Sequence, residues 1–275
     1  MSAVPGRRDA GLIASAALAL VFVLAALLGL AGAFDAGLKL DIATRLTPPG
    51  AAHWLGSDAL GRDVLAMIAA GAATSLGVAL GAVLMGLAGG VPLGLLAAVL
   101  GGRGEETVAR LNDVVFALPP LLLAVLLAAT LGPGPVTAIV ALGVFNVPVF
   151  ARVTRAGART ILARDFVSAA RLAGKGPLAI AREHVLPNLT GLLAVQATIQ
   201  VALGIAAEAG LSYVGLGVQP PAPSWGRMLH DAQTLTGLAP WLAWCPGIAL
   251  ALAVLAFSRL GDRLGAWLDP RRRAR

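Results

Sequence analysis

Long uncharged runs of apolar residues dominate this chain of 275 residues. A helix needs about 20 consecutive apolar residues to cross the hydrocarbon core of a membrane. The runs also lack the ten-residue alternation that marks the strands of a membrane β-barrel. The pattern therefore predicts an all-α integral membrane protein with six transmembrane helices. We place these helices at Ala10–Phe34, Leu76–Leu100, Val114–Leu131, Val136–Phe150, Leu189–Ala207 and Trp241–Phe257.

Two of the uncharged runs are too long for one straight span. The run from Val64 to Gly102 exceeds what a bilayer requires, so we place the second helix in its later part. The run 114–151 contains Leu131-Gly-Pro-Gly-Pro135, a strong turn signal that divides it into the third and fourth helices. The first run is longer than the 7–15 apolar residues of a signal peptide, although Ala31-Gly-Ala33 resembles a cleavage site. We therefore expect an uncleaved first span.

Composition and charge support a membrane protein and set its orientation. Hydrophobic residues make up 58% of the chain and charged residues 13%, whereas soluble domains carry about 25% charged residues. Seventeen of the 21 lysines and arginines lie in segments that share one side when the N-terminus is inside. Because basic residues accumulate in cytoplasmic loops, both termini are predicted to be cytoplasmic. Topology thus accounts for the net charge of +7, and nucleic acid is not a predicted partner.

A charged, helix-forming island, residues 165–188, separates the fourth and fifth spans. Asp165 can cap a helix that runs through Ala173, and the Gly174-Lys-Gly-Pro177 turn then breaks it. A second short helix can extend to about His184 before the chain resets for the fifth span. The residues alone leave two interpretations open. The island is either a lever that a soluble partner pushes or an amphipathic segment that rests on membrane lipid.

The island resembles the EAA loop of permease subunits in bacterial ABC importers. The resemblance rests on Ser168-Ala-Ala170, on Gly174 after three further residues, and on Leu186-Pro187. In that family the loop forms a coupling helix that sits in a groove of the ATPase subunit. Ser168 stands where the family has a glutamate, which removes a possible ionic contact with the ATPase. The resemblance implies that the ATPase is contacted by Asp165, Ser168, Ala169, Ala170, Gly174, His184, Leu186 and Pro187.

Further segments resemble the peptide/nickel branch of this family, and specifically its C-type permease. Gly56–Asp63 is similar to the signature before the second span, with Ser57 in place of threonine. Glu208–Gly226 resembles the segment after the fifth span very closely. The tail Gly261–Arg271 also matches, except that Gly265-Ala266 replaces a usual Arg-Asp pair. Together the motifs cover residues from about 53 to 271.

This resemblance implies a domain layout, a function and a set of partners. The expected fold is the six-helix permease of an importer, with a cytoplasmic coupling helix, in a bacterial inner membrane. The expected partners are a second permease in a heterodimer, two ATPase subunits and an extracytoplasmic substrate-binding protein. Di- or oligopeptides are the expected substrate, with nickel or a nickel chelate as the alternative. The layout comprises an N-terminus (1–9), a first helix (10–34), an external loop (35–75), a core (76–265) with the coupling loop (157–187), and a basic tail (266–275).

Four residues in external segments are candidates for contact with the binding protein. Asp58, Arg62 and Asp63 lie in the loop before the second span, and Trp225 lies in a proline-rich segment after the fifth. Either aspartate can instead cap the helix that follows. Trp225 can instead belong to the architecture of its loop.

Three polar residues near the spans are candidates for the translocation path. Glu208 is an acid at the end of an apolar span, and such groups are costly at membrane depth. It either lines a pore or gate, or lies in the outer headgroup region and pairs locally. Asn146 and Gln196 either line the path or form hydrogen bonds between helices. Arg152, Arg155 and Arg159 share one helical face and are expected to anchor the chain at the cytoplasmic side.

The sequence offers no catalytic set, metal site or cofactor site. Ala173-Gly-Lys175 lacks the upstream glycine and the following Ser or Thr of a nucleotide-binding P-loop, so ATP and magnesium are expected only in the partner ATPases. The three histidines form no ligand pair at helical spacing. A stand-alone secondary transporter or channel is a competing class. It predicts charged or broken helices at the bilayer midplane, which are nearly absent. A membrane-embedded enzyme would need catalytic groups that the pattern does not show.

Overall fold

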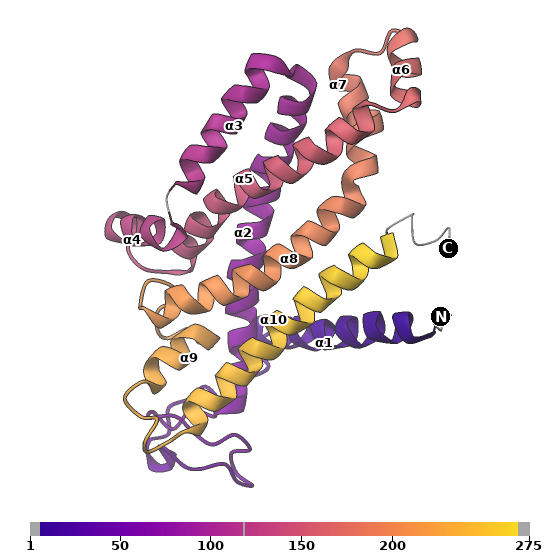
Figure 1. The fold of residues 1–275 in the computed structure, drawn as a ribbon. Helices are drawn as coiled ribbons and strands as arrows, with labels where there is room; N and C mark the ends of the chain where they lie inside the picture. The colour runs from indigo at the N-terminus through magenta and orange to yellow at the C-terminus, as the bar shows by residue number, and fades with distance from the viewer. Residues whose placement is uncertain (1–5, 118, 269–275) are drawn as a thin grey trace.

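A computed structural model describes residues 6–117 and 119–268, and their regular elements are helical (Figure 1). One isolated antiparallel bridge pairs Ser57 with Asp63. The predicted all-α class is confirmed for these residues. The helices are α1 (Gly6–Leu30), α2 (Val64–Leu100), α3 (Gly102–Phe116), α4 (Pro120–Leu131), α5 (Pro135–Leu162), α6 (Asp165–Leu172), α7 (Pro177–Ile180), α8 (Leu186–Tyr213), α9 (Trp225–Ala232) and α10 (Trp241–Leu268), with a 3-10 turn at Ile42–Thr44 and a π-helical turn at Ala181–Val185.

Five helices in the described part of the chain are long and apolar enough to cross a membrane, and a bent pair raises this number to six. The bent pair is α3 and α4, whose axes differ by 76° across a short break. The prediction of one straight third helix over Val114–Leu131 is therefore wrong. Pro119 and Pro120 explain the break, since proline lacks a backbone N–H and disfavours helix in the residue before it.

Most of the spans are longer than predicted. The helix α2 starts at Val64 because the Asp63 carboxylate accepts a hydrogen bond from the Ala66 N–H at 2.9 Å. The expected reset before the fifth span does not occur, because the π turn Ala181–Val185 joins α7 to α8. Pro187 lacks the N–H that would continue regular α-helical bonding, and the wider turn precedes it. The predicted N-terminus (1–9) and basic tail (266–275) extend beyond the described residues.

The most extensive contact between helices joins α2 to α5. Three glycines on one side of α2 lie against α5: Gly86, Gly90 and Gly94. A Cβ atom added to Gly90 would lie 2.4 Å from the Val147 carbonyl oxygen, and one added to Gly94 would lie 2.4 Å from that of Ala151. The two backbones therefore approach as closely as in small-residue interfaces of membrane helices. The helix α1 also packs against α2, and α10 packs against α8 and α1.

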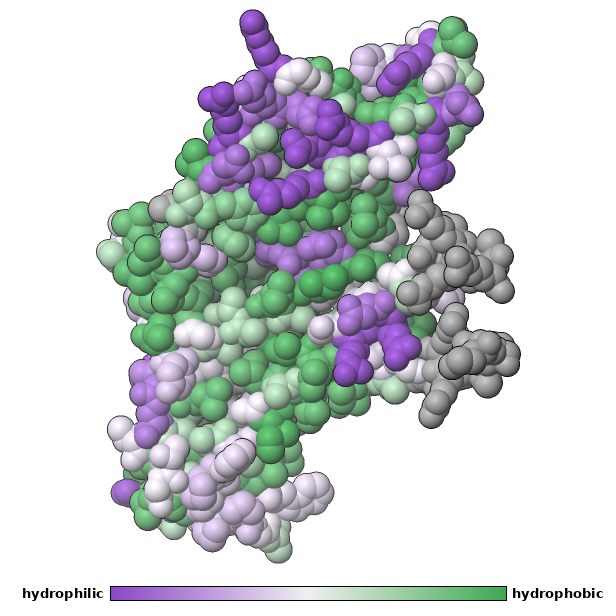
Figure 2. All heavy atoms as spheres, in the orientation of Figure 1, coloured by the Kyte–Doolittle hydropathy of each residue, from purple (hydrophilic) through white to green (hydrophobic). Residues whose placement is uncertain are grey.

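Polar and apolar side chains are segregated along the bundle (Figure 2). Charged side chains gather at the end formed by α3, the last turns of α5, α6 and α7. The flanks between the two ends are largely apolar and include many exposed leucines, among them Leu20, Leu84 and Leu203. The opposite end carries α9 and the loop that leads into α2. We call these the coupling end and the outer end, after the roles that the sequence predicts for them.

Replacing Gly90 with alanine should destabilise the bundle, because its Cβ would collide with the backbone of α5. Overpacking of this kind typically costs about 1–3 kcal/mol. The control is Gly77→Ala in the same helix, where an added Cβ meets no atom within 4 Å. Thermal unfolding in detergent should show a lower midpoint for the first variant only. Equal midpoints would contradict the close packing of α2 on α5.

Candidate functional site

The first candidate site is the projecting hairpin of α6 and α7 at the coupling end (Figure 1). A glycine turn ends α6 by two backbone hydrogen bonds. The Gly174 N–H donates to the Arg171 carbonyl at 3.0 Å, and the Lys175 N–H donates to the Ala170 carbonyl at 3.1 Å. This is the Schellman arrangement, and it places Gly174 at φ +83° in the left-handed region. The helix break predicted at this glycine is confirmed.

One face of α6 holds the hairpin to the bundle. Val167 is fully buried and Ala170 nearly so, because both belong to the main hydrophobic core. The Phe166 ring meets the His184 ring edge-on at 6.2 Å. The Lys175 ammonium pairs with the Glu183 carboxylate at 2.5 Å. The two halves of the hairpin are therefore fixed to each other as well as to the spans.

The other face of α6 is exposed and partly apolar. Ser168 and Ala169 lie on it, Leu172 is 91% exposed, and Leu178 on α7 is 80% exposed. The sequence analysis did not select these two leucines as site residues. Large apolar residues beside the glycines of a charged segment are nevertheless a signal that could have identified them. Large apolar side chains exposed on a hairpin that projects from the bundle favour, without proving, a surface that a partner covers.

Three predicted contact residues of the hairpin have other positions than expected. Asp165 is not the cap of α6, because Arg164 precedes the helix without a capping side chain and Asp165 lies in the first turn. Its charge there still favours the helix N-terminus. Leu186 and Pro187 form the first turn of α8, beyond the π turn.

Basic residues of α5 tie α3 to the base of the hairpin. Glu105 pairs with Arg155 at 3.4 Å and with Arg159 at 3.0 Å. Arg152 lies 4.8 Å from the centroid of the Phe116 ring and 3.6 Å from the Asp113 carboxylate. The three arginines predicted as an anchor thus bind a neighbouring helix. A cavity of about 290 Å³ lies nearby, between the end of α2 (Ala98 and Val99) and the hairpin.

The second candidate site lies at the outer end, where two aspartates shape the loop before α2. The Asp58 carboxylate accepts hydrogen bonds from the Leu60 and Arg62 N–H groups and pairs with the Arg62 guanidinium at 2.7 Å. Asp63 caps α2 and also contacts His53 Nδ1 at 2.9 Å. The capped turn inferred from the sequence is confirmed.

Trp225 is a buried structural residue and not an exposed contact. Its side chain is fully buried, its indole N–H donates to the Ile68 carbonyl at 2.9 Å, and its backbone N–H donates to Ser75 Oγ at 3.2 Å. Phe22 packs edge-on against the indole at 5.5 Å. The prediction of direct contact with a binding protein is therefore wrong for Trp225. The tryptophan instead fixes the start of α9 to α2.

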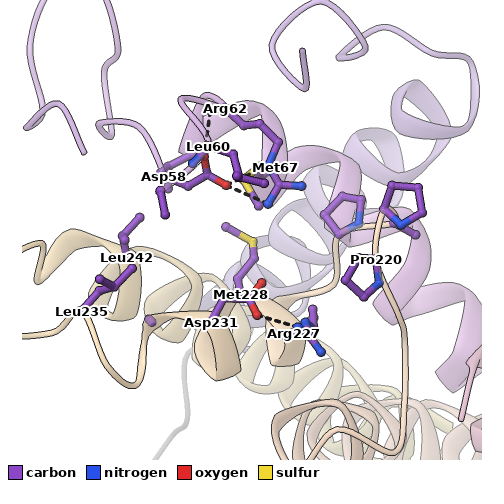
Figure 3. A pocket seen from close by; sticks show the side chains of 16 residues that line it. Asp58, Leu60, Arg62, Met67, Pro220, Arg227, Met228, Asp231, Leu235 and Leu242 are labelled. Carbon is purple, nitrogen blue, oxygen red and sulfur yellow. Dashed lines mark hydrogen bonds and ion pairs between the residues drawn. The ribbon is translucent and has the colours of Figure 1, made fainter. Parts of the chain in front are cut away.

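A cavity of about 300 Å³ opens between the loop before α2, the proline-rich loop and α9 (Figure 3). Asp58 and Arg62 lie on one wall, and the Arg227–Asp231 ion pair, at 2.9 Å, lies across from them. Between these pairs the lining is apolar. Two of the four predicted outer residues, Asp58 and Arg62, therefore line one cavity, whereas Asp63 and Trp225 do not.

Of the three polar candidates inside the bundle, Glu208 and Asn146 are buried and Gln196 is partly exposed. Ser212 Oγ donates to Glu208 Oε1 at 2.6 Å, and Glu208 has no exposed surface. The local pairing expected for this acid is present, and in this conformation it faces neither the lipid nor an open path. Gln200 Nε2 donates to Asn146 Oδ1 at 2.6 Å, which joins α8 to α5. The interhelical hydrogen bond expected as one role of Asn146 is therefore present, and its partner Gln200 was not among the candidates.

Comparison with known proteins identifies relatives over most of the chain. A family model described as "Binding-protein-dependent transport system inner membrane component" matches residues 90–274. The di/tripeptide transport system permease protein DppC of Pseudomonas aeruginosa (strain UCBPP-PA14) is 43% identical over 232 residues, 82% of this chain and 77% of the relative. The glutathione transport system permease protein GsiD of Pectobacterium atrosepticum is 37% identical over 238 residues, 86% of this chain and 79% of the relative.

A solved structure has the same fold. The inward-facing MetNI methionine ABC transporter contains a chain that superposes with a TM-score of 0.63 at 22% sequence identity. The match covers 74% of this chain and 97% of that chain. The predicted permease fold is therefore confirmed.

Replacing Gly174 with alanine should loosen the hairpin, because a left-handed φ costs an L-residue roughly 1–2 kcal/mol. Gly176→Ala is a matched control: neither glycine has an atom within 4 Å of an added Cβ, but Gly176 has an ordinary φ of −71°. Amide hydrogen exchange over residues 165–185 should quicken by about tenfold for Gly174→Ala alone. If both variants exchange at the wild-type rate, the turn does not depend on this glycine.

Proposed function

Because the chain belongs to the family of inner membrane components of binding-protein-dependent transport systems, we propose that it forms half of a translocation path for short peptides. It is a multi-pass permease of an ABC importer. A second permease would supply the other half in a heterodimer. Two ATPase subunits would bind ATP and magnesium and supply the energy, and this chain would contribute no catalytic group.

The observation that supports coupling to an ATPase is the rigid hairpin with its exposed leucines. The hairpin is held by a glycine turn, a buried face and an ion pair. A force on α6 would therefore be transmitted to α5 and α8. Leu172 and Ala169 offer an apolar, small-residue surface that would fit a groove. ATP binding would move the ATPases, and the movement would switch the spans between outward and inward access.

The relatives favour peptides over nickel as the substrate. Their names specify di- and tripeptides, dipeptides and glutathione. Among the described residues, no group of three or more His, Cys, Asp or Glu side chains could hold a metal ion. A stand-alone transporter or channel is disfavoured by the family itself, whose members work with a binding protein.

The distribution of charge supports a cytoplasmic coupling end. Arg152, Arg155 and Arg159 lie there beside α3, at the end where hydrophilic side chains gather in Figure 2. Since basic residues accumulate on the cytoplasmic side, the outer end would face the binding protein.

Leu172→Glu should prevent docking of the ATPase, because it places a charge in a contact that excludes water. In a complex purified with its encoded neighbours, the ATPases should be lost and ATP-driven uptake of a labelled dipeptide should fall at least tenfold. Leu172→Met should retain both, and Ala163→Glu controls for added charge at the same end. Wild-type uptake of nickel without dipeptide, or an unaffected Leu172→Glu complex, would contradict the proposal.

The orientation can be tested with one accessible cysteine. Ser168→Cys, in a chain whose Cys245 is replaced by alanine, should react with an impermeant maleimide only from the cytoplasmic side, since Ser168 is exposed on α6. Labelling of Ser168→Cys from outside, in intact cells or right-side-out vesicles, would show that the orientation is the reverse of the one proposed. Thr44→Cys at the outer end is the matched site and should show the opposite pattern.

A further inference from the structure

The cavity at the outer end has the composition of a pocket for an apolar group (Figure 3). Its floor includes Met67 and Met228, and Leu60, Leu235 and Leu242 lie around them. Methionine is flexible and polarisable, so it adapts to apolar groups of different shape. The volume of about 300 Å³ is at the small end of ligand sites. The space therefore suits one inserted side chain and not an extended ligand.

The charged groups of the cavity are already paired with one another. Asp58 and Arg62 lie 2.7 Å apart, and Arg227 and Asp231 lie 2.9 Å apart. A free peptide would bring its own ammonium and carboxylate, and each needs a counter-charge when it leaves water. The two acids and two bases on the walls could act as counter-charges to the peptide only if their existing ion pairs were broken. The lining therefore disfavours the free substrate and favours an uncharged apolar group with a polar rim around it.

The cavity is also preformed. One wall belongs to the start of α2, and the other belongs to α9 and the loop that precedes it. The hydrogen bonds from Trp225 to Ile68 and Ser75 hold these walls together. A rigid apolar pocket with a polar rim is typical of the energetic centre of a protein interface, because little ordering is needed on binding.

We propose that this cavity receives an apolar side chain, of leucine or phenylalanine size, from the substrate-binding protein. The inference rests on the proposed function, because it requires that such a protein docks on the outer end. The inserted side chain would touch α2, α9 and α10 together. Docking would thus act on these three helices through a single contact.

The test compares two tryptophan substitutions on the same loop. Ala59 and Ala51 are both exposed, but only Ala59 lines the cavity. The importer complex is placed in nanodiscs, and its affinity for the purified binding protein is measured by interferometry. Ala59→Trp should weaken binding at least tenfold by filling the entrance, and Ala51→Trp should change it less than twofold. Equal affinities for the two variants would overturn the inference.

A crosslinking experiment serves if Ala59→Trp fails to assemble. Leu60 lines the cavity and is 46% exposed, so a benzoylphenylalanine in its place should form an adduct with the binding protein on irradiation. Absence of the adduct, in a complex that still binds the protein, would overturn the inference. Loss of free dipeptide binding in Ala59→Trp, with unchanged affinity for the binding protein, would also overturn it and make the cavity a substrate site.

Stimulation of ATP hydrolysis separates the two proposals. If the binding protein stimulates the wild-type complex while Ala59→Trp and Ala51→Trp bind it equally, only the cavity inference fails. If the wild-type complex is not stimulated by any binding protein encoded beside it, the proposed function fails, and the cavity inference fails with it.

Discussion

The close approach of α2 to α5 is the contact on which the rest of the structure depends. Lipid tails are as apolar as leucine, so burial from water does not drive one span against another, and dispersion contact between close backbones becomes decisive. Gly86, Gly90 and Gly94 allow that approach along two turns of α2. With α5 fixed in this way, its last turns carry the arginines that bind α3, and its C-terminus delivers α6 to the coupling end.

The hairpin after α5 combines an exposed surface with a backbone that several contacts hold in place. Its exposed apolar side chains lie on a segment that a loop alone would leave mobile. Here Gly174 closes α6, Val167 and Ala170 fasten it, and α7 continues through a π turn into α8. The second half of the hairpin is therefore a continuation of α8, and only Ala163 and Arg164 separate α6 from the end of α5. If an ATPase docks on the hairpin, as proposed above, this connection would let it act on helices that it does not touch.

The sequence predicted the class, the order of the spans and the break at Gly174, because these follow from hydrophobic length and from the special φ of one residue. It did not predict where the helices end, since an uncharged run does not distinguish a helix inside the membrane from one that extends beyond it. It also misplaced Trp225, because a tryptophan in a loop has the same sequence signature whether its ring faces a partner or the core. The sequence named Gln196 and not Gln200 as a candidate for an interhelical hydrogen bond, because the two glutamines are one turn apart and only packing distinguishes them. The spacing of Gly86, Gly90 and Gly94 carried a readable signal for the α2–α5 contact.

The length of α2 has a mechanical consequence. At 37 residues and 1.5 Å per residue, the helix is about 55 Å long, well beyond the roughly 30 Å of a hydrocarbon core. Val64 and Met67 at its start line the outer cavity, and Ala98 and Val99 at its end line the cavity beside the hairpin. The glycine contact lies between these ends and is the natural pivot. A rigid rod of this length that tilts by about 5° displaces one end relative to the other by about 5 Å, which is close to one turn of helix.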